Sequence, residues 1–161
     1  MRVGPVVANN TPLVAYWSIS RLDILQTLFE EIQIPSAIRD EFLASATLNR
    51  FESLLSASWI KVVPLSRPNA ADAFAGLDRG EAEVIALAQE QEARLVLLDE
   101  RRARRYATRM SLPVSGTLGV LLLAKQEGLI EAVRPLISDL IATGLYVHHD
   151  LVDKITFLAG E

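Results

Sequence analysis

The chain has 161 residues, of which 50% are hydrophobic and 22% charged, which is typical of a folded globular protein and not of a disordered one. Its length suits one domain with a sizeable core, so we expect a single domain over residues 1–161. The absence of cysteine excludes disulfide bonds and thiolate metal sites, and two histidines argue against a His-rich zinc site. The net charge of −4 argues against tight nonspecific DNA binding through bulk charge, although it permits a local basic patch.

No signal peptide is visible, and the longest strongly apolar run covers residues 118–124. A helix that spans a bilayer needs about 20 apolar residues. We therefore expect a cytoplasmic protein that does not associate with a membrane.

The first half of the chain reads as short strands that alternate with helices. The β-branched residues 3–7 predict a first strand, after which Thr11 is expected to cap a helix and Pro12 to open it. Ser20 is expected to start the next helix. The pattern further predicts a strand over 32–34, a helix over 35–44, a short helix over 47–57, a strand over 59–63 and a loop over 64–75.

The clearest pattern covers residues 78–105, which predict a helix, a buried strand and a second helix. Asp78 and Glu81 match a capping box at the start of the first helix. The aliphatic strand over 95–98 ends abruptly at Asp99 and Glu100. In open α/β sheets function gathers outside the carboxyl ends of the strands, so this is the first place to look for a site.

The last third predicts a strand over 113–115, a very apolar helix that starts at 116–119 and is ended by Gly128, and helices over 130–143 and 148–158. The segment over 118–124 suits an interface, but so apolar a helix is more safely assigned to the core. Strands that alternate with helices favour an α/β fold, in which a central parallel sheet is covered on both faces in three layers, α/β/α.

Polar side chains follow several of the predicted strands, and in a parallel sheet they project toward one edge. They are Asn9, Glu41, Glu81, Glu83, Asp99 and Glu100. Oxygen ligands without Cys or His suit hard cations such as Mg²⁺ or Mn²⁺. Such ions support phosphoryl chemistry, because they activate water and stabilise charge on phosphate oxygens.

Each acid also has a purely structural interpretation. Glu81 completes the capping box, Asp99 is placed to cap the helix that follows it, and Glu41 suits a solvated helix position. Glu81 and Glu83 lie about 200° apart around a helix, so at most one of them faces a shared site. The functional interpretation therefore rests on several acids at one edge and not on any single residue.

Five arginines follow Asp99 on one predicted helix, and they wrap most of its circumference. Arg101, Arg105 and Arg109 share a stripe with the spacing i, i+4, i+8. The stripe is either a solvated face paired with Glu100 and its neighbours, or a set of phosphate contacts beside a metal site.

Near the end of the chain stands the run His148-His149-Asp150. Adjacent side chains on a helix or a strand point apart, so we expect the two histidines to chelate poorly. Surface residues, or a helix that starts near Asp150, are the preferred interpretation.

Five short motifs follow one another along the chain. They are VANNTPL at 7–13, IPSAIRDE at 34–41, GEAEVIALA at 80–88, LLDERRAR at 97–104 and GTLGVL at 116–121. In this order they resemble the motifs of the PIN-domain family, which includes the VapC ribonuclease toxins. The resemblance is closest to a compact branch of the family that carries Asn in its first motif.

The resemblance implies an acidic pocket that binds Mg²⁺ or Mn²⁺ and hydrolyses RNA phosphodiesters. The positions that match the pocket are Asn9, Glu41, Glu81 and Asp99, with Glu81 favoured over Glu83 because the third acid of the family usually lies near the helix start. Four residues are secondary or accessory members, and two arginines are assigned to RNA binding. The secondary set is Thr11, Glu83, Glu100 and Thr117, and the RNA-binding pair is Arg101 and Arg105.

Our leading hypothesis is a metal-dependent ribonuclease, the toxin of a toxin–antitoxin pair, with an antitoxin protein as partner and a homodimeric assembly as in related proteins. Its first-motif acid is Asn9, an amide that can coordinate through its oxygen but has no charge, so we assign it to orienting a water or a substrate oxygen. This substitution motivates an alternative, a PIN-like module that binds RNA or protein with weakened or lost catalysis. A receiver-like or nucleotide-binding domain ranks below both, since neither a Gly-rich loop nor an acid pair follows the first strand.

Overall fold

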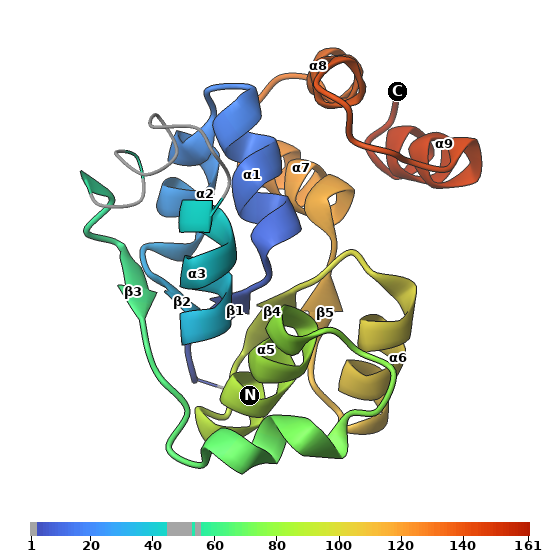
Figure 1. The fold of residues 1–161 in the computed structure, drawn as a ribbon. Coiled ribbons are helices and arrows are strands. Elements are labelled where there is room, and N and C mark those ends of the chain that lie inside the picture. The colour runs from blue at the N-terminus through green and yellow to red at the C-terminus, as the bar shows by residue number, and fades with distance from the viewer. Residues whose placement is uncertain (1–2, 45–52, 54–55) are drawn as a thin grey trace.

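A computed structural model of the protein describes residues 3–44, 53 and 56–161 (Figure 1). Within these residues five strands form one sheet in the order β3-β2-β1-β4-β5, and neighbouring strands pair in parallel throughout. The strands are β1 (Val6–Ala8), β2 (Ile32–Ile34), β3 (Ile60–Val62), β4 (Leu95–Leu97) and β5 (Val114–Ser115).

Helices cover both faces of this sheet, so the predicted three-layer α/β/α fold is confirmed (Figure 1). Helices α1, α2 and α7 pack together on one side, whereas α5 and α6 pack on the other. The helices are α1 (Asn10–Ser18), α2 (Leu22–Phe29), α3 (Ser36–Ala44), the 3-10 helix η1 (Pro68–Ala73), α5 (Arg79–Glu90), α6 (Arg101–Arg109), α7 (Thr117–Gln126), α8 (Arg134–Ala142) and α9 (His149–Leu158).

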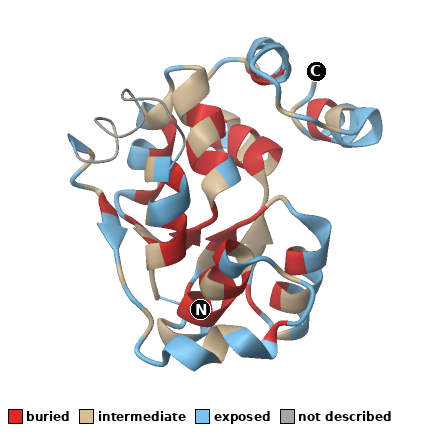
Figure 2. Ribbon diagram, in the orientation of Figure 1, coloured by how far each residue is buried: buried red, intermediate tan, exposed pale blue. Residues whose placement is uncertain are grey.

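The core lies on the two faces of the sheet, where burial is greatest in the strands and in the inner sides of α5 and α7 (Figure 2). Helix α7 buries Leu118, Val120, Leu121 and Ala124, so the assignment of this apolar segment to the core is confirmed. Among the described helices, none has both the length and the apolar character required to cross a membrane.

Strand β1 is the centre of the sheet, and the connection direction reverses between β1 and β4. The chain moves from β1 to β2 and β3 on one side, and returns to place β4 and β5 on the other. The register pairs Ala8 with Leu97, and the backbone N–H of Asn9 donates to the carbonyl of Leu97 at 2.9 Å. The loops after β1 and β4 therefore begin side by side at a topological switch point, where ligands of α/β proteins bind.

Two predicted helix starts are wrong. Helix α1 begins at Asn10 and not at Pro12, because Asn9 has extended backbone (φ −80°, ψ 172°) and is both the residue after β1 and the N-cap. Thr11 is therefore inside the first turn. Ser20 has φ 56° and belongs to the turn between α1 and α2, so α2 starts only at Leu22.

The other predicted boundaries differ less from those in the structure. The segment over 64–75 was predicted as a loop, but Pro68 opens the 3-10 helix η1, which its fixed φ favours. The first strand begins at Val6 and not at Val3, because residue 6 is the first to pair with β2 and β4. The helix predicted over 47–57 lies almost wholly outside the described residues.

Glu161 ties the last helix to the rest of the fold. Its carboxylate accepts hydrogen bonds from the backbone N–H of Val133 at 2.7 Å and of Arg134 at 3.2 Å, and it pairs with Lys125 at 2.9 Å. Lys125 also donates to the carbonyl of Ala159 at 2.6 Å. The N–H of Val133, with the help of Lys125, lowers the pKa of Glu161 from 4.5 to about 2.

Glu161→Gln should lower the thermal midpoint at pH 7. The lowered pKa means that the ionised side chain stabilises the fold above pH 4.5, and that this contribution is lost as the pH falls toward 2. The difference in midpoint between parent and variant should therefore narrow over that range, as measured by circular dichroism. Glu127→Gln, at the exposed end of α7, is the matched control and should leave the midpoint unchanged; equal midpoints for Glu161→Gln and the parent at pH 7 would contradict the assignment.

Candidate active site

Asp99 is held by two hydrogen bonds from the first residue of α7. The backbone N–H of Thr117 donates to Oδ1 at 2.8 Å, and its hydroxyl donates to Oδ2 at 2.6 Å. Thr117 is fully buried. These bonds join the loop that follows β4 to the loop that follows β5, and they fix the orientation of the carboxylate at the carboxyl edge of the sheet.

The expectation that Asp99 caps α6 is wrong. Glu100 occupies the N-cap position, where its side chain accepts a hydrogen bond from the N–H of Ala103 at 2.8 Å. Glu100 comes one residue after Asp99 and is better placed to accept from the free N–H groups of the first turn. Asp99 therefore bonds with Thr117 instead. The predicted accessory acid Glu100 thus has one carboxylate oxygen engaged by its own helix.

Gly116 allows the backbone to approach Asp99 closely. A Cβ atom at this position would lie 2.7 Å from Oδ1 of Asp99 and 2.9 Å from Nη1 of Arg104. Arg104 itself donates to the carbonyl of Leu98 at 3.1 Å. The side chains of Asp99 and Arg104 therefore both lie close to the backbone at Gly116, where no side chain separates them from it.

Tyr16 of α1 forms a hydrogen bond with Thr117, the residue that holds Asp99. Its hydroxyl donates to the carbonyl of Thr117 at 2.9 Å, and the residue is fully buried. Burial and, to a smaller extent, the negative charge of Asp99 hold the pKa of Tyr16 well above its ordinary value. The phenol therefore remains a donor, and it links α1 to the first residue of α7.

Asn9 lies directly after β1, beside the loop that carries Asp99. It is only 7% exposed, and it occupies the N-cap position of α1 without a side-chain capping bond. Within the described part of the chain, no residue forms a hydrogen bond with its side-chain amide. The amide oxygen is therefore free to bind a ligand, whereas Thr11 is exposed on the first turn of α1.

A second group of acids gathers where α3 meets α5. Burial, and then the negative charges of Asp78, Glu81 and Glu83, raise the pKa of Glu41, and Arg79 opposes them. Gly80 makes room for this group, because a Cβ atom there would collide with Oε1 of Glu41.

The capping box at the start of α5 is confirmed. Glu81 N–H donates to Asp78 at 2.8 Å, and the side chain of Glu81 accepts from the N–H of Asp78 at 3.1 Å. Burial raises the pKa of Glu81, and the negative charges of Asp78 and Glu100 raise it further. Glu83 is turned to other partners, because it accepts from the N–H of Ala37 at 3.2 Å and pairs with Arg79 at 2.9 Å.

Residues 5–161 match the family described as DUF3368: PIN domain. The chain belongs to the PIN-domain family. PIN domains have a nuclease-type fold and generally use divalent metal ions. No curated protein sequence matches the chain.

The chemistry of this PIN domain's acids fits a hard divalent cation. The candidate ligands are carboxylates and one neutral amide, which are the donors that Mg²⁺ and Mn²⁺ prefer. Burial, and then the neighbouring like charges, raise the pKa of Glu41 and of Glu81, and a bound cation would favour their ionised forms. Gly80 and Gly116 leave space beside the carboxylates of Glu41 and Asp99.

The predicted ligands do not form a closed set in this structure. In the described part of the chain, the side chains that bring three ligand atoms within 4.8 Å of one another are His148, His149 and Asp150. Glu41 and Glu81 belong to the acid group at α3 and α5, whereas Asp99 is bonded to Thr117. The joint assignment of these residues to one metal ion stays a prediction.

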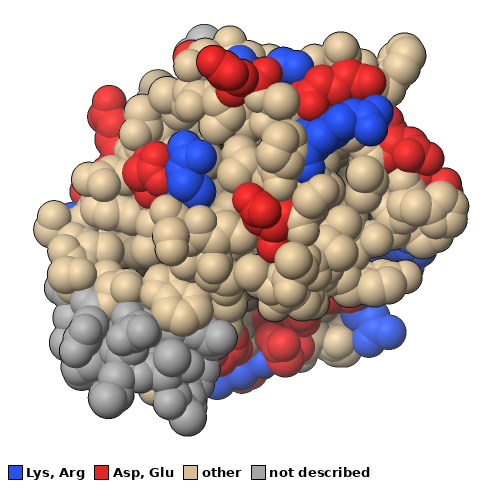
Figure 3. All heavy atoms as spheres, turned by 90° about the horizontal axis from the view of Figure 1, so that it is seen from above, with Lys and Arg blue, Asp and Glu red and all other residues tan. Residues whose placement is uncertain are grey.

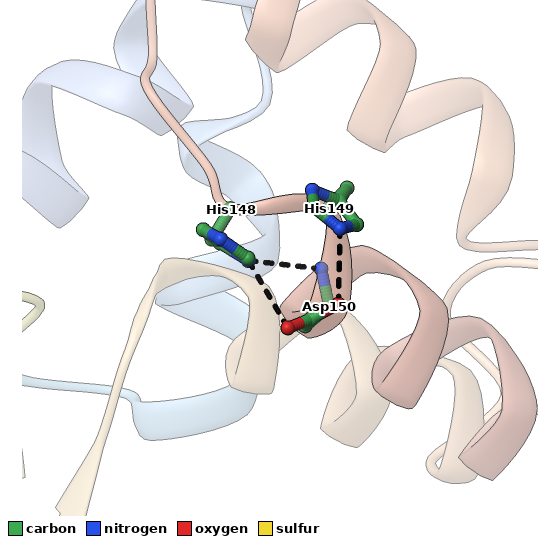
Figure 4. Close-up of side chains that lie close together, drawn as sticks. All are labelled: His148, His149 and Asp150. Carbon is green, nitrogen blue, oxygen red and sulfur yellow. Dashed lines mark hydrogen bonds and ion pairs between the residues drawn. The ribbon is translucent and has the colours of Figure 1, made fainter.

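The two histidines do not point apart as predicted, because their rings stack at a centroid distance of 4.4 Å (Figure 4). His148 caps α9 by accepting the N–H of Asp150 at 3.1 Å, and Nε2 of His149 lies 3.1 Å from Oδ1 of Asp150. All three side chains are exposed. The start of a helix explains these contacts, in agreement with the prediction of a helix at this point.

A groove of about 730 Å³ opens beside Asp99, and three arginines of the predicted stripe, Arg101, Arg105 and Arg109, line it. Arg102 is turned away and donates to the carbonyl of Gly76 at 3.0 Å. Arg104, one of the five arginines that follow Asp99, also lines the groove although it lies off the stripe. Lys154 of α9 lines it too, and this residue is not marked by any sequence signal.

Gly80→Ala should weaken Mn²⁺ binding by about tenfold, because the new methyl group displaces the carboxylate of Glu41. The fold should persist, since alanine favours a helix by up to about 1 kcal/mol over glycine and the contacts to be relieved, Glu41 Oε1 and Ile38 Cδ1, are ends of side chains. Calorimetric titration with Mn²⁺ measures the effect. In a double-mutant cycle, Gly80→Ala should add nothing to Glu41→Gln; full additivity would show that the methyl group acts elsewhere.

Glu41→Gln should raise the thermal midpoint at pH 7 by about 1–2 °C, the effect of about 0.5 kcal/mol in a domain of this size, because solvent screens the exposed carboxylate and keeps the effect small. A raised pKa means that the parent loses stability as the pH rises from 4.5 through that pKa, and the variant lacks this loss. The difference should vanish below pH 4.5. Asp40→Asn is the matched control, because Asp40 pairs with Arg39 and Arg79, so its loss should not stabilise the fold. A lower midpoint for Glu41→Gln than for the parent would contradict the interpretation that burial and neighbouring like charges destabilise the ionised side chain of Glu41.

Proposed function

We propose that this PIN domain is a metal-dependent ribonuclease, with residues 1–161 acting as a single domain. The observation that carries the proposal is the position of Asp99, which Thr117 fixes at the switch point of the sheet, beside Asn9 and at the mouth of an arginine-lined groove. A polyanion that enters such a groove reaches a fixed carboxylate, and membership of the PIN family agrees with nucleic-acid binding.

In this proposal Glu41, Glu81, Asp99 and Asn9 hold Mg²⁺ or Mn²⁺. When bound, such an ion lowers the pKa of water and neutralises charge on phosphate oxygens. Thr117 keeps Asp99 oriented, and Asn9 orients a water or a substrate oxygen through its free amide. The guanidinium groups of Arg101 and Arg105 contact the phosphates that flank the scissile bond.

We extend the proposal to a biological role, the toxin of a toxin–antitoxin pair. Support comes from the five motifs that resemble those of the VapC toxins, in the same order along the chain. The partners would be RNA, an antitoxin protein and a second copy of the chain in a homodimer, and the location would be the cytoplasm.

Asn9 favours a second candidate, a binding module that has the PIN fold but does not cleave. A carboxylate at this position would add a full negative charge to the site, and the amide supplies only an oxygen. The two candidates differ in one measurable way, because a binding module holds RNA in the presence of EDTA and leaves it intact when Mn²⁺ is added.

Asp99→Ala and Glu41→Ala should each reduce Mn²⁺-dependent cleavage of RNA by about 100-fold or more, since the ion's several kcal/mol of charge stabilisation depend on these ligands. The parent should lose activity in EDTA and recover it with Mn²⁺. Asp139→Ala, an exposed acid on α8, is the control and should cleave like the parent. Cleavage by Asp99→Ala and Glu41→Ala at the parent's rate would disprove the site, and no cleavage by the parent would favour the binding module.

A further inference from the structure

The groove beside Asp99 is lined by residues from three helices that are distant in the sequence. Helix α6 contributes the arginines, α7 contributes residues at its start, and α9 contributes Leu151, Lys154, Ile155 and Leu158. We propose that this α6–α9 groove binds a single-stranded segment of RNA that extends from the phosphodiester at Asp99. The inference rests on the proposed ribonuclease function, to which it adds the path of the substrate and the residues that hold it.

Charge is the first argument. The chain as a whole is acidic, with a net charge of −4. Among the described residues that line the groove, however, Asp99 is the only acid, and four arginines and one lysine lie with it. Among the described residues, no acid lies within ion-pair distance of Arg101, Arg105 or Lys154. By contrast, Figure 3 shows the molecule from above the view of Figure 1, and on this face acidic and basic side chains lie in small neighbouring groups. The unpaired cations of the groove are thus available for phosphates.

The spacing of these cations is the second argument. Arg101, Arg105 and Arg109 follow one another every four residues on α6, which places them about 6 Å apart along the helix axis. All three line the groove, and Lys154 faces the same space from α9. A row of cations on one wall suits a chain that carries a phosphate at every nucleotide, and the row begins at Asp99, where the scissile phosphate is proposed to lie.

The apolar part of the groove decides between single and double strands. Leu151 is 42% exposed and Leu158 53% exposed on α9. The faces of unpaired bases are apolar and can cover such side chains. A duplex keeps its base faces stacked inside, and presents only phosphates, hydroxyls and base edges. Cations beside exposed aliphatic side chains therefore match a single strand.

The test is binding of a fluorescein-labelled single-stranded RNA octamer by anisotropy, in EDTA so that no cleavage occurs. Arg105→Glu/Lys154→Glu should lower the affinity by about tenfold or more. It should also reduce the slope of log K against log salt by about 0.7 for each lost phosphate contact. Leu151→Ser/Leu158→Ser should weaken binding about threefold or more and leave the salt slope unchanged, because apolar contacts release no counterions. A duplex of equal length should bind the parent more weakly than the single strand does.

Lys61→Glu/Arg67→Glu is the matched control, with the same change in charge on exposed residues of β3 and the loop after it, at the opposite edge of the sheet. It should bind like the parent, and all variants should keep the parent's thermal midpoint within a few degrees. Equal losses in the groove and control variants would overturn the inference, as would a parent that binds no single strand at 50 mM salt. If the parent binds no single strand, an acidic protein segment becomes the preferred occupant of the groove. Failure of Mn²⁺-dependent cleavage with this binding pattern intact would overturn the ribonuclease proposal alone.

Discussion

Two hydrogen bonds from Thr117 to Asp99 connect the parts of the protein on which its proposed chemistry depends. Asp99 follows β4 and Thr117 follows β5, so the bonds tie together two loops at the same edge of the sheet. Tyr16 extends the connection to α1 through the carbonyl of Thr117, and Asn9 lies at the start of that same helix. The parallel register of β1 with β4 makes this possible, because it places the carboxyl ends of both strands side by side.

A second constraint is the crowding of acids between α3 and α5. Glu41 and Glu81 have raised pKa values because each is partly buried near other carboxylates. Such crowding opposes folding at neutral pH, and a divalent cation is the simplest agent that relieves it. Structural roles coexist with this one, since Glu81 completes a capping box and Glu83 pairs with Arg79. Glu81 and Glu83 thus have structural partners at the start of α5 and also contribute negative charge to this group of acids.

Acidic and basic side chains of this PIN domain gather in different places near the carboxyl edge of its sheet. Acids gather near α3 and the start of α5, whereas the cations of α6 and α9 line the groove beside Asp99. In the proposed ribonuclease, a substrate that carries phosphates would be drawn to the cations and repelled by the acids unless a metal ion neutralised them. This separation explains how an acidic protein can present a local surface for a polyanion, and it assigns different tasks to the two sides of the site.

The sequence by itself determined the α/β fold, the capping box and the position of Asp99 at a strand end, because periodicity, aliphatic runs and cap spacing are local properties of the chain. It also marked Thr117 as a neighbour of the site through the family's late motif, but not as the partner of both oxygens of Asp99. Only the tertiary structure decided that Glu100 caps α6, that α1 starts at Asn10, that His148 and His149 stack, and that Lys154 shares a groove with Arg105. The reason is that a hydrogen-bonding side chain takes the best-placed partner available. That choice depends on where strands stop and how helices pack, and distance along the chain does not encode it.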